Sequence, residues 1–315
     1  MTDPRTLTLR LTVSGDEGVA ANEAVAGEAW AAVLAVFSAV DVAMSRFRQD
    51  SELTTLCRLS PAPAGMVSRM LARALVAADR ATRITEGRFD PRVVGALERI
   101  GYSGVSLGRV AGADHLRPGA RGRVMFRSGR HGPISLREAV DLGGIGKGLA
   151  LRWAGRELDR IVGARSASGR GYLLDAGGDI VVAGEPAEGR PWHVGIEDPA
   201  GGLEPVAVVA IRGREGIATS SVRRLRWERD GRTVHHLIDP RTGEPAASGL
   251  LAVTVAGPDP AWAEVWSKAL FVEGRAGIGP LARSRGLAAW WVTEDGALEM
   301  TPAARIRIAW TASGT

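Results

Sequence analysis

The sequence predicts an α+β fold, in which antiparallel strands and grouped helices form a single compact unit with two lobes. Helical patterns gather near the N-terminus and again after residue 260. Strand patterns follow one another between residues 171 and 256 without a regular alternation of strand and helix. No repeat or linker interrupts the 315 residues, and a hydrophobic content of 45% is ample for a full core. We therefore expect one domain that covers residues 1–315.

The N-terminal third combines one strand with two long helices. Apolar and polar residues alternate from Thr6 to Val13, which predicts a half-buried strand. Residues 20–40 and 66–86 repeat apolar side chains at helical spacing and predict amphipathic helices. Between them, Ser51 is placed to cap a short helix. A tight turn at residues 87–94 follows the second long helix.

The rest of the chain is richer in strands. Residues 101–133 are rich in glycine and arginine and predict short strands and surface loops. After residue 133 we expect strands at 135–140, 171–175, 180–183, 193–196, 206–211, 223–228, 233–238, 250–256, 287–293 and 305–310, and helices at 149–158, 261–273 and 276–285.

Charge and cysteine content exclude several classes of protein. The formal net charge is +5, but the arginines alternate with acidic residues and form no basic tail, which argues against nucleic acid as a partner. The single cysteine, Cys57, excludes an internal disulfide and a cysteine metal site. The N-terminus has no leader pattern, and no segment offers 18 uninterrupted apolar residues. We therefore expect a cytoplasmic protein without membrane insertion.

The segment Asp141–Gly148 carries four glycines and Lys147 and leads directly into a predicted helix. Glycines allow backbone to approach a ligand closely, and a helix start offers free N–H groups with a positive dipole end. This combination suits a phosphate or pyrophosphate, although the spacing matches neither a P-loop nor the dinucleotide fingerprint. The alternative is a turn between strand and helix that needs glycine for close packing.

Five short stretches place a carboxylate or histidine beside glycine or proline. Taken singly, each is an ordinary turn or strand end. Taken together, they are expected to converge on one cleft. They are Phe89–Pro91, Asp141–Gly144, Ala176–Asp179, Glu197–Pro199 and His235–Gly243.

These motifs, in this order, resemble those of the FAD:protein FMN transferases, the ApbE-like flavin transferases. The resemblance runs from about Asp41 to Gly274, and no single motif carries it alone. Its segments are Ser45–Leu53, Gly87–Pro91, Asp141–Gly148, Asp175–Ile180, Trp192–Pro199, Ala218–Ser220, His236–Gly243 and Ala269–Val272.

The resemblance implies a T-fold-like ApbE architecture and a specific reaction. FAD binds in a cleft, Mg²⁺ bridges its pyrophosphate, FMN passes to a Ser or Thr hydroxyl of a partner protein, and AMP leaves. This is phosphoryl transfer, which requires charge neutralisation, an aligned hydroxyl and a base. Two alternatives stay open: a FAD pyrophosphatase that yields FMN and AMP, and a non-catalytic FAD-binding protein.

The resemblance also implies roles for individual residues. His236 is the candidate base, because an imidazole with a near-neutral pKa suits that task; the alternative is a histidine packed in a strand. His235 is expected on the opposite face of that strand. The carbonyl of Gly144 and the carboxylate of Glu264 are the candidate magnesium ligands. The residues expected to contact FAD are Phe47, Arg88, Phe89, Asp90, Asp141, Lys147, Thr219, Ile238 and Lys268.

The sequence departs from the family pattern at the magnesium ligands. Glu264 stands where the family has Asp, and Lys268 stands where it has Thr. Glutamate remains a suitable oxygen ligand, but a protonated lysine cannot coordinate magnesium. Either the Lys268 ammonium takes the place of the metal at the pyrophosphate, or Glu264 and Lys268 form an i, i+4 ion pair in a remodelled site. A third possibility is an ordinary exposed pair on the helix surface.

Overall fold

The computed structural model describes residues 7–14, 19–59, 67–102, 126–127, 134–136, 138–163, 170–186, 190–223 and 225–312. The chain divides into two units, each assembled from separate segments. Unit 1 comprises residues 1–37, 147–224 and 248–315, and unit 2 comprises residues 38–146 and 225–247. The expected α+β class with antiparallel sheets is confirmed. The expectation of a single domain over residues 1–315 stays a prediction.

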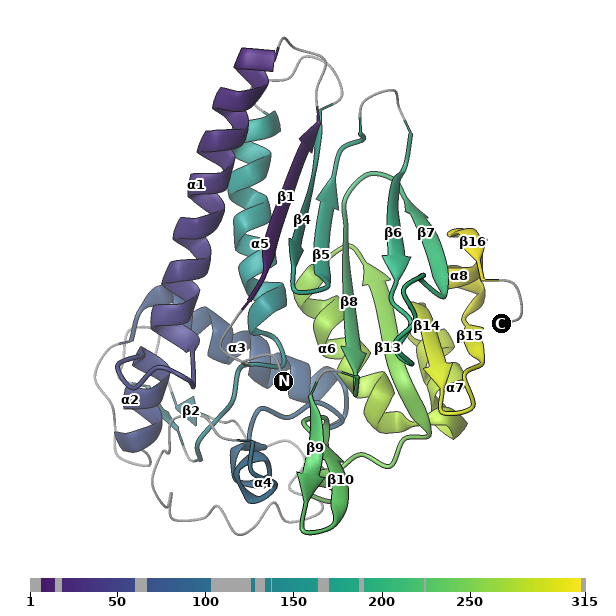
Figure 1. Cartoon of the computed structure of the whole chain (residues 1–315). Coiled ribbons are helices and arrows are strands. Elements are labelled where there is room, and N and C mark those ends of the chain that lie inside the picture. The colour runs from purple at the N-terminus through teal and green to yellow at the C-terminus, as the bar shows by residue number, and fades with distance from the viewer. Residues whose placement is uncertain are drawn as a thin grey trace. The chain divides into compact units, whose positions relative to one another are not determined.

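Unit 1 is organised around a seven-stranded antiparallel sheet (Figure 1). β8 and β13 occupy its middle and hydrogen-bond to neighbours on both edges. Across the sheet the strands are β1 (Leu9–Ser14), β4 (Gly171–Ala176), β5 (Asp179–Ala183), β8 (Glu215–Ser221), β13 (Leu250–Gly257), β14 (Ala288–Thr293) and β15 (Leu298–Met300).

A smaller antiparallel sheet packs on one face of the large one. It consists of β6 (Trp192–Ile196), β7 (Ala207–Ile211) and β16 (Ile308–Thr311), and α8 (Pro302–Arg305) precedes its last strand. Apolar side chains of both sheets meet in one core cluster that includes Trp192, Val209 and Trp290. This face of unit 1 is therefore a layer of sheet on sheet.

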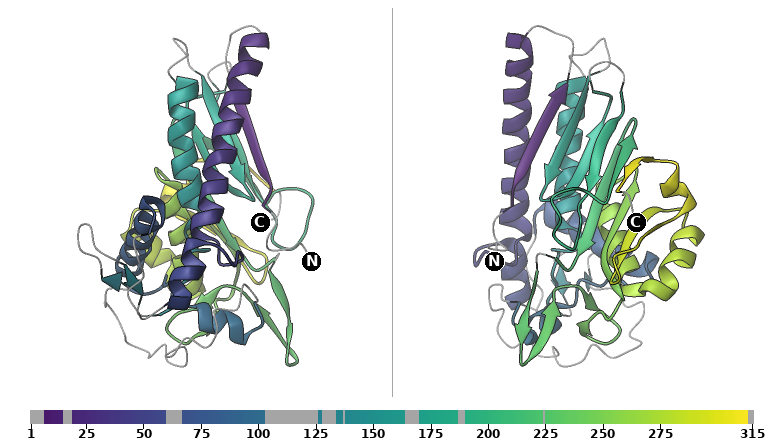
Figure 2. Two further views of the ribbon diagram at one scale, coloured as in Figure 1. Left: turned by 90° about the vertical axis from the view of Figure 1, so that its left-hand side faces the viewer. Right: turned by 45° about the vertical axis from the view of Figure 1, so that its right-hand side comes forward.

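Helices cover the opposite face of the large sheet. Val181 and Val182 are adjacent on β5 and belong to different core clusters, as expected for side chains that alternate across a strand. The helix-side cluster joins residues of α1 (Val19–Met44) and α5 (Gly146–Leu158) to β4 and β5, and Figure 2 shows α5 lying along these strands. A π-helical turn, η1 (Asp159–Gly163), extends α5.

The last two long helices of unit 1 are α6 (Pro260–Glu273) and α7 (Arg275–Ser284). The Asp259 side chain accepts from the N–H groups of Ala261 and Trp262 and caps α6. α6 packs against β8 and β13, and eleven of its residues are buried. A helix that is apolar nearly all round fits this central position.

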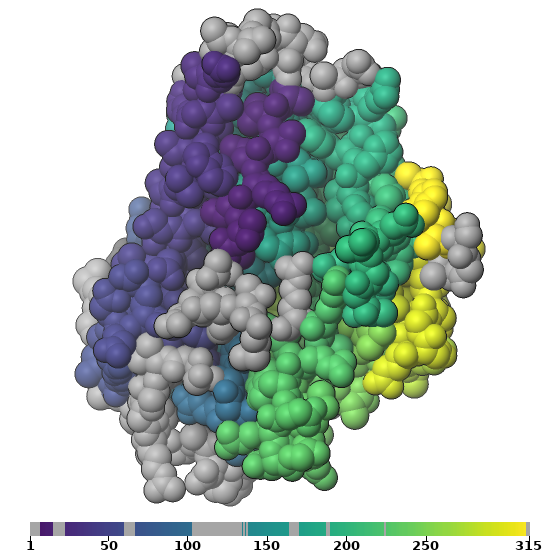
Figure 3. Space-filling view, in the orientation of Figure 1, coloured from purple at the N-terminus to yellow at the C-terminus, as the bar shows by residue number. Residues whose placement is uncertain are grey.

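One stretch of α1, Glu23–Met44, is long and apolar enough to cross a membrane by length and composition alone, with a mean hydropathy of 1.6. Part of that apolar character serves the fold. Val25, Ala29 and Val33 repeat at intervals of four residues and are buried in the helix-side core. The opposite side of the helix is open to solvent (Figure 3), and Leu34 is 45% exposed.

Unit 2 contains the end of α1 and a set of short elements. The Ser51 side chain accepts from the N–H of Thr54, which confirms the expected helix cap. Ser68 caps the next helix by accepting from Leu71. The elements are α2 (Glu52–Leu59), α3 (Arg69–Ile84), α4 (Val94–Arg99), β2 (Phe126–Arg127) with β3 (Ser135–Leu136), β9 (Arg226–Arg229) with β10 (Arg232–His235), and β11 (Ile238–Asp239) with β12 (Glu244–Pro245).

Some elements differ from the expected ones. Residues 233–238 are not one strand, because β10 ends at His235 and a bend follows. Of the strand expected at 135–140, Ser135–Leu136 forms β3 and residues 138–140 are irregular, and the strand expected from residue 223 begins at Arg226. α5 begins at Gly146, three residues early, and β8 was not predicted. The loops expected between residues 103 and 133 lie outside the described residues except for 126–127.

Candidate functional site

Two lysines and two carboxylates form a polar network in unit 1. The first pair lies where α5 and β5 begin: the Lys147 ammonium pairs with Asp179, whose side chain is 2% exposed. The other carboxylate oxygen of Asp179 accepts from the backbone N–H of Thr219 at 3.1 Å. Asp179 therefore joins the beginning of α5 to the central strand β8.

Glu264 is the second carboxylate and is only 1% exposed. One of its oxygens accepts from the backbone N–H of Gly148 at 2.8 Å, and the other lies 3.2 Å from Nζ of Lys268. The i, i+4 ion pair expected from the sequence is therefore present. Because Glu264 is buried, the third alternative drawn from the sequence, an ordinary exposed pair, does not apply. A buried carboxylate needs such partners to stay ionised.

The four groups interact electrostatically as one network. Burial alone would lower the pKa of Lys147, but the charges of Asp179, Glu264 and Asp175 outweigh burial and hold the pKa above its ordinary value. Lys147 is therefore a charged ammonium at neutral pH. With Lys268 also paired, the network consists of two ammonium groups and two carboxylates.

Two glycines bring the beginning of α6 close to this network. A Cβ at Gly148 would lie 2.5 Å from Cα of Ala261, and a Cβ at Gly216 would lie 2.3 Å from Cα of Pro260. No larger residue fits at either position without moving backbone. The packing interpretation of the glycine-rich segment is thus correct for Gly148, whose N–H also reaches Glu264 one turn into α6.

A second cluster, in unit 2, surrounds the Arg46 guanidinium. Arg46 donates to Oδ2 of Asp141 at 3.1 Å and to the carbonyl of Tyr102 at 2.9 Å. Its central carbon lies 5.4 Å from the ring centroids of both Phe47 and Tyr102, within the range of cation–π attraction. Asp141 also accepts from the N–H of Gly143 at 2.6 Å.

His236 belongs to the same unit and lies in the bend after β10. Its ring centroid is 6.2 Å from that of Tyr102, which stacks at 5.8 Å on Trp227. Nδ1 of His236 faces the carbonyl of Leu225 at 3.4 Å. Since a carbonyl only accepts, this contact favours the tautomer with the proton on Nδ1 and a lone pair on Nε2.

His235, the neighbour, has a different environment. Burial, aided by the charge of Arg226, lowers the pKa of its imidazole. Its Nδ1 accepts from the backbone N–H of Leu237 at 3.3 Å. His235 is therefore a neutral histidine held by local structure. The expectation that it lies on the opposite face of a strand shared with His236 was wrong, because β10 ends at His235.

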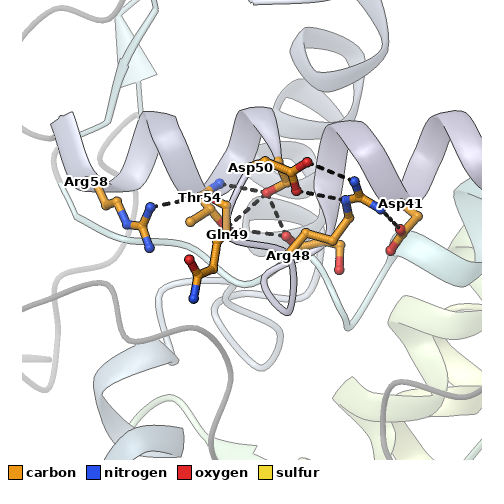
Figure 4. A network of polar contacts seen from close by, with 8 residues as sticks. Asp41, Arg48, Gln49, Asp50, Thr54 and Arg58 are labelled. Carbon is orange, nitrogen blue, oxygen red and sulfur yellow. Dashed lines mark hydrogen bonds and ion pairs between the residues drawn. The ribbon is translucent and has the colours of Figure 1, made fainter.

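The loop that carries Phe47 is held in place by ion pairs (Figure 4). Arg48 donates to Asp41 at 3.1 Å and to Asp50 at 2.9 Å, and these contacts connect the end of α1 to the loop. Arg58 donates to the carbonyl of Gln49 at 3.1 Å. These contacts lie on both sides of Phe47, and those of Arg48 are exposed.

Residues 88–90 form a turn in which one side chain is ion-paired, one is buried and one is hydrogen-bonded within the turn. Arg88 pairs with Glu86 at 3.2 Å, and Phe89 is 5% exposed. The Asp90 carboxylate accepts from both the backbone N–H and the guanidinium of Arg92, and this hydrogen bonding raises the pKa of Arg92. The carboxylate of Asp90 therefore holds its own turn together.

The remaining candidates are placed as follows. Ile238 is 6% exposed and packs in the core of unit 2 with Ala96 and Leu97. Thr219 lies on β8, and its hydroxyl is 2.9 Å from that of Thr254. Gly144 lies in the turn before α5. The parts of the chain that the structure describes contain no cluster of three or more His, Cys, Asp or Glu that could hold a metal ion.

The structure thus brings together four candidates in unit 1: Lys147, Thr219, Glu264 and Lys268. In unit 2 it places Phe47, Asp141 and His236 around a shared aromatic cluster. Three members of that cluster were missed from the sequence: Arg46, Tyr102 and Trp227. Asp179 was noted as part of a strand-end motif but was not among the candidates, although a carboxylate directly after two glycines was the available signal.

This arrangement of helices and antiparallel sheets is the fold of solved flavin-transferase structures. The ApbE protein of Thermotoga maritima superposes with a TM-score of 0.79 at 24% identity over 95% of each chain. The flavinyl transferase ApbE of Pseudomonas stutzeri, in its apo form, gives a TM-score of 0.74 at 24% identity over 98% of this chain and 100% of its own. The model of the ApbE family matches residues 6–291, and the chain therefore belongs to the ApbE family.

Curated relatives carry the name FAD:protein FMN transferase. The Treponema pallidum protein is 31% identical over 278 residues, which cover 79% of this chain and 73% of the relative. The Klebsiella pneumoniae protein is 35% identical over 158 residues, which cover 50% of this chain and 43% of the relative. This match therefore spans less than half the length of the Klebsiella relative. The family resemblance drawn from the motifs is confirmed.

Proposed function

We propose that this protein transfers FMN from FAD to a Ser or Thr hydroxyl of a partner protein and releases AMP. Membership of the ApbE family and the names of the curated relatives support this activity. The observation that carries the proposal is the network around Glu264, which gathers two ammonium groups at the beginning of α5. Ammonium groups beside a helix N-terminus suit the pyrophosphate of FAD.

In the proposed reaction, the acceptor hydroxyl oxygen attacks the phosphorus of the FMN half. A new phosphorus–oxygen bond forms, the bond to the bridging oxygen breaks, and AMP leaves with the electron pair. The hydroxyl proton passes to a base, for which we propose Nε2 of His236. The tautomer favoured by the Leu225 carbonyl leaves a lone pair on that atom.

We assign recognition of the FAD rings to the aromatic cluster of unit 2. Phe47 and Tyr102 offer flat faces on which ring systems stack. Of the other candidates, Asp141, Lys147, Thr219 and Lys268 belong to the polar clusters described above. Direct contacts of Arg88, Phe89, Asp90 and Ile238 with FAD remain predictions, because these side chains serve the turn at residues 88–92 and the core of unit 2.

Magnesium, which the family resemblance implies, does not fit the donor set of α6. Both carboxylate oxygens of Glu264 already accept hydrogen bonds, one from Gly148 and one from Lys268. The ammonium of Lys268 would repel a dication placed beside Glu264. Gly144 offers only its carbonyl as a further oxygen ligand.

The activity is tested with FAD and a candidate acceptor protein. We expect AMP to appear only when the acceptor is present and the acceptor to gain the mass of FMN in mass spectrometry. AMP release without an acceptor would identify a FAD pyrophosphatase instead. FAD that stays intact for hours with the acceptor would identify a non-catalytic flavin-binding protein.

We also propose that the protein acts in the cytoplasm. Its one cysteine, Cys57, is buried and free, which is compatible with a reducing compartment. Cell fractionation followed by immunoblotting tests the location, and recovery in the membrane or secreted fraction would contradict it.

A further inference from the structure

The choice of basic residues in this chain is unusual. The sequence has 40 lysines and arginines, of which only two, Lys147 and Lys268, are lysine, and the other 38 are arginine. The two lysines are 121 positions apart in the sequence (268 minus 147). Both nevertheless belong to the network of unit 1.

The geometry connects the two lysines through Glu264. Lys268 contacts one carboxylate oxygen of Glu264 at 3.2 Å, and the charge of the same carboxylate raises the pKa of Lys147. The other oxygen of Glu264 is held by Gly148, the residue directly after Lys147. Every lysine of the chain is therefore placed at one site.

Lysine and arginine differ in ways that matter at such a site. The ammonium is a compact point charge with three rotatable N–H donors, whereas the guanidinium is a wide planar fork. Among the described residues, Glu264 is the one hydrogen-bond partner of the Lys268 ammonium. Two donors remain for ligand oxygens, and the 20% exposure of the side chain leaves a route to them.

The two ammonium groups of the network balance the carboxylates with which they pair, so these pairs do not need a metal ion for neutralisation. Two ammonium groups offset two carboxylates, so the four groups carry no net charge (2 − 2 = 0). Asp175 adds a further carboxylate near Lys147, but Glu264, the carboxylate on α6, already accepts hydrogen bonds on both oxygens and is poorly placed to coordinate a divalent cation. The N-terminus of α5, whose Gly148 N–H already contacts Glu264, adds partial positive charge that favours an anion.

We propose that Lys268 is a built-in cation that binds the pyrophosphate of FAD in place of a divalent metal. This inference rests on the proposed function and deepens it. The ammonium of Lys268 keeps its contact with Glu264 and donates its other hydrogens to pyrophosphate oxygens, while Lys147 contributes the second positive charge. FAD binding and FMN transfer then proceed without a divalent metal.

Binding is tested first, with FAD titrated by fluorescence in EDTA and in magnesium. We expect the same affinity in both buffers. Lys268→Gln, which removes the charge but keeps an N–H donor on a side chain one atom shorter, should weaken FAD binding by about 10-fold to 100-fold, the loss expected for one charge-assisted hydrogen bond. The control Arg275→Gln removes an exposed cation of α7 and should leave the affinity unchanged.

The two lysines also permit a direct spectroscopic test. Protein labelled with ¹³Cε-lysine should show two lysine signals, and Lys268→Gln identifies the one from Lys268. Adding FAD or inorganic pyrophosphate in EDTA should shift that signal. If the Lys268 signal does not move while FAD binds, the proposal is overturned.

A double substitution tests whether FAD binding becomes dependent on magnesium when Lys268 is removed. Glu264→Asp combined with Lys268→Thr restores the oxygen ligands that the resemblance implies and should make FAD binding depend on magnesium. A double variant that binds FAD equally well in EDTA would contradict a role for position 268 in replacing the metal.

The outcomes separate this inference from the proposed function. FAD that binds in EDTA and shifts the Lys268 signal, without FMN transfer to any acceptor, would overturn the transferase activity and leave the built-in cation standing. FMN transfer by the unmodified chain that stops in EDTA would support the transferase and overturn the built-in cation.

Discussion

Arg46 and Asp141 form a buried ion pair, with Nη1 and Oδ2 3.1 Å apart and side chains that are 5% and 10% exposed. The two residues are 95 positions apart in the sequence. Their contact fixes the loop after α1 to the beginning of the glycine-rich segment, and the Arg46 guanidinium also lies over the rings of Phe47 and Tyr102. One side chain thus organises the aromatic part of the candidate site.

Replacing Arg46 by alanine should destabilise the protein strongly. Asp141 would remain buried with only the N–H of Gly143 as a described partner. Removing one partner of a buried ion pair typically costs about 3–5 kcal/mol, because the other charge is left uncompensated. Urea unfolding followed by circular dichroism measures the change in the free energy of unfolding.

Arg48→Ala is the matched control for this prediction. Arg48 lies two residues further on and also forms ion pairs, but its partners Asp41 and Asp50 are exposed. Exposed pairs contribute little to stability. A loss of stability as large for Arg48→Ala as for Arg46→Ala would show that burial of the Arg46–Asp141 pair is not the cause.

Substitution of His236 should affect the reaction more than binding. If Nε2 accepts the hydroxyl proton, His236→Ala should lower the rate of FMN transfer by about 10²-fold to 10⁴-fold, the usual contribution of a general base. FAD affinity should change much less. His235→Ala is the control and should keep the transfer rate. Single-turnover AMP release measures both variants, and a normal rate for His236→Ala would exclude it as the base.

Gly148→Ala should damage the fold at the network. The added Cβ would lie 2.5 Å from Cα of Ala261 and 2.6 Å from the carbonyl oxygen of Pro260, so that α5 and α6 must separate. Overpacking of this kind costs about 1–3 kcal/mol, and we expect a lower melting temperature together with weaker FAD binding.

Gly146→Ala provides the comparison for Gly148→Ala, because both glycines belong to the first turn of α5. A Cβ at Gly146 would meet only Cε of Met44, at an ordinary 3.7 Å. Alanine is also a better helix former than glycine. Gly146→Ala should therefore be neutral or stabilising, and equal damage by both substitutions would rule out the contact with α6 as the cause.

Stability should fall at high pH through Cys57. Burial raises the pKa of its thiol from 9.0 to about 11. The folded state therefore favours the neutral thiol, and its contribution is complete below pH 9. It is lost as the pH rises through 11, because the unfolded chain then releases the proton more readily. Two pKa units correspond to roughly 2–3 kcal/mol.

Cys57→Ala isolates this contribution. The difference in unfolding free energy between the unmodified protein and Cys57→Ala should shrink between pH 9 and pH 11, as measured by urea unfolding at several pH values. A difference that stays constant over this range would contradict the raised pKa. The subtraction cancels other groups that titrate in the same window, such as Tyr172, whose pKa burial also raises.

Strong local patterns allowed most of the fold to be predicted. The helix expected at residues 66–86 is α3, and its first residue follows the cap at Ser68. β8 was missed because burial hides the alternation on which strand prediction relies: residues 216–218 are buried in succession. Two of the three extra residues at the beginning of α5 are glycines, which helix propensity disfavours, and packing against α6 requires glycine at Gly148.

The polar part of the candidate site was more predictable than the aromatic part. Lys147, Glu264 and Lys268 stand in local motifs, and the i, i+4 spacing gave the pair between the last two as one of the alternatives. The contacts of Arg46 with Tyr102 and of Tyr102 with Trp227 join residues that are far apart in the sequence. Local sequence patterns do not predict such contacts, because tertiary packing creates them.

Gly148 and Gly216 position the beginning of α6 through backbone contacts that do not involve the side chains of Glu264 and Lys268. Backbone-to-backbone packing sets where α6 begins, and the helical repeat then fixes where residues 264 and 268 project. Substitutions at these two positions leave that backbone contact in place, although a residue at 264 must also accept from the N–H of Gly148. A lineage could convert a metal-dependent site into a metal-free one, or reverse that step, by substitutions on a single helical turn. The same property makes α6 a convenient place to engineer flavin attachment for environments where divalent ions are scarce.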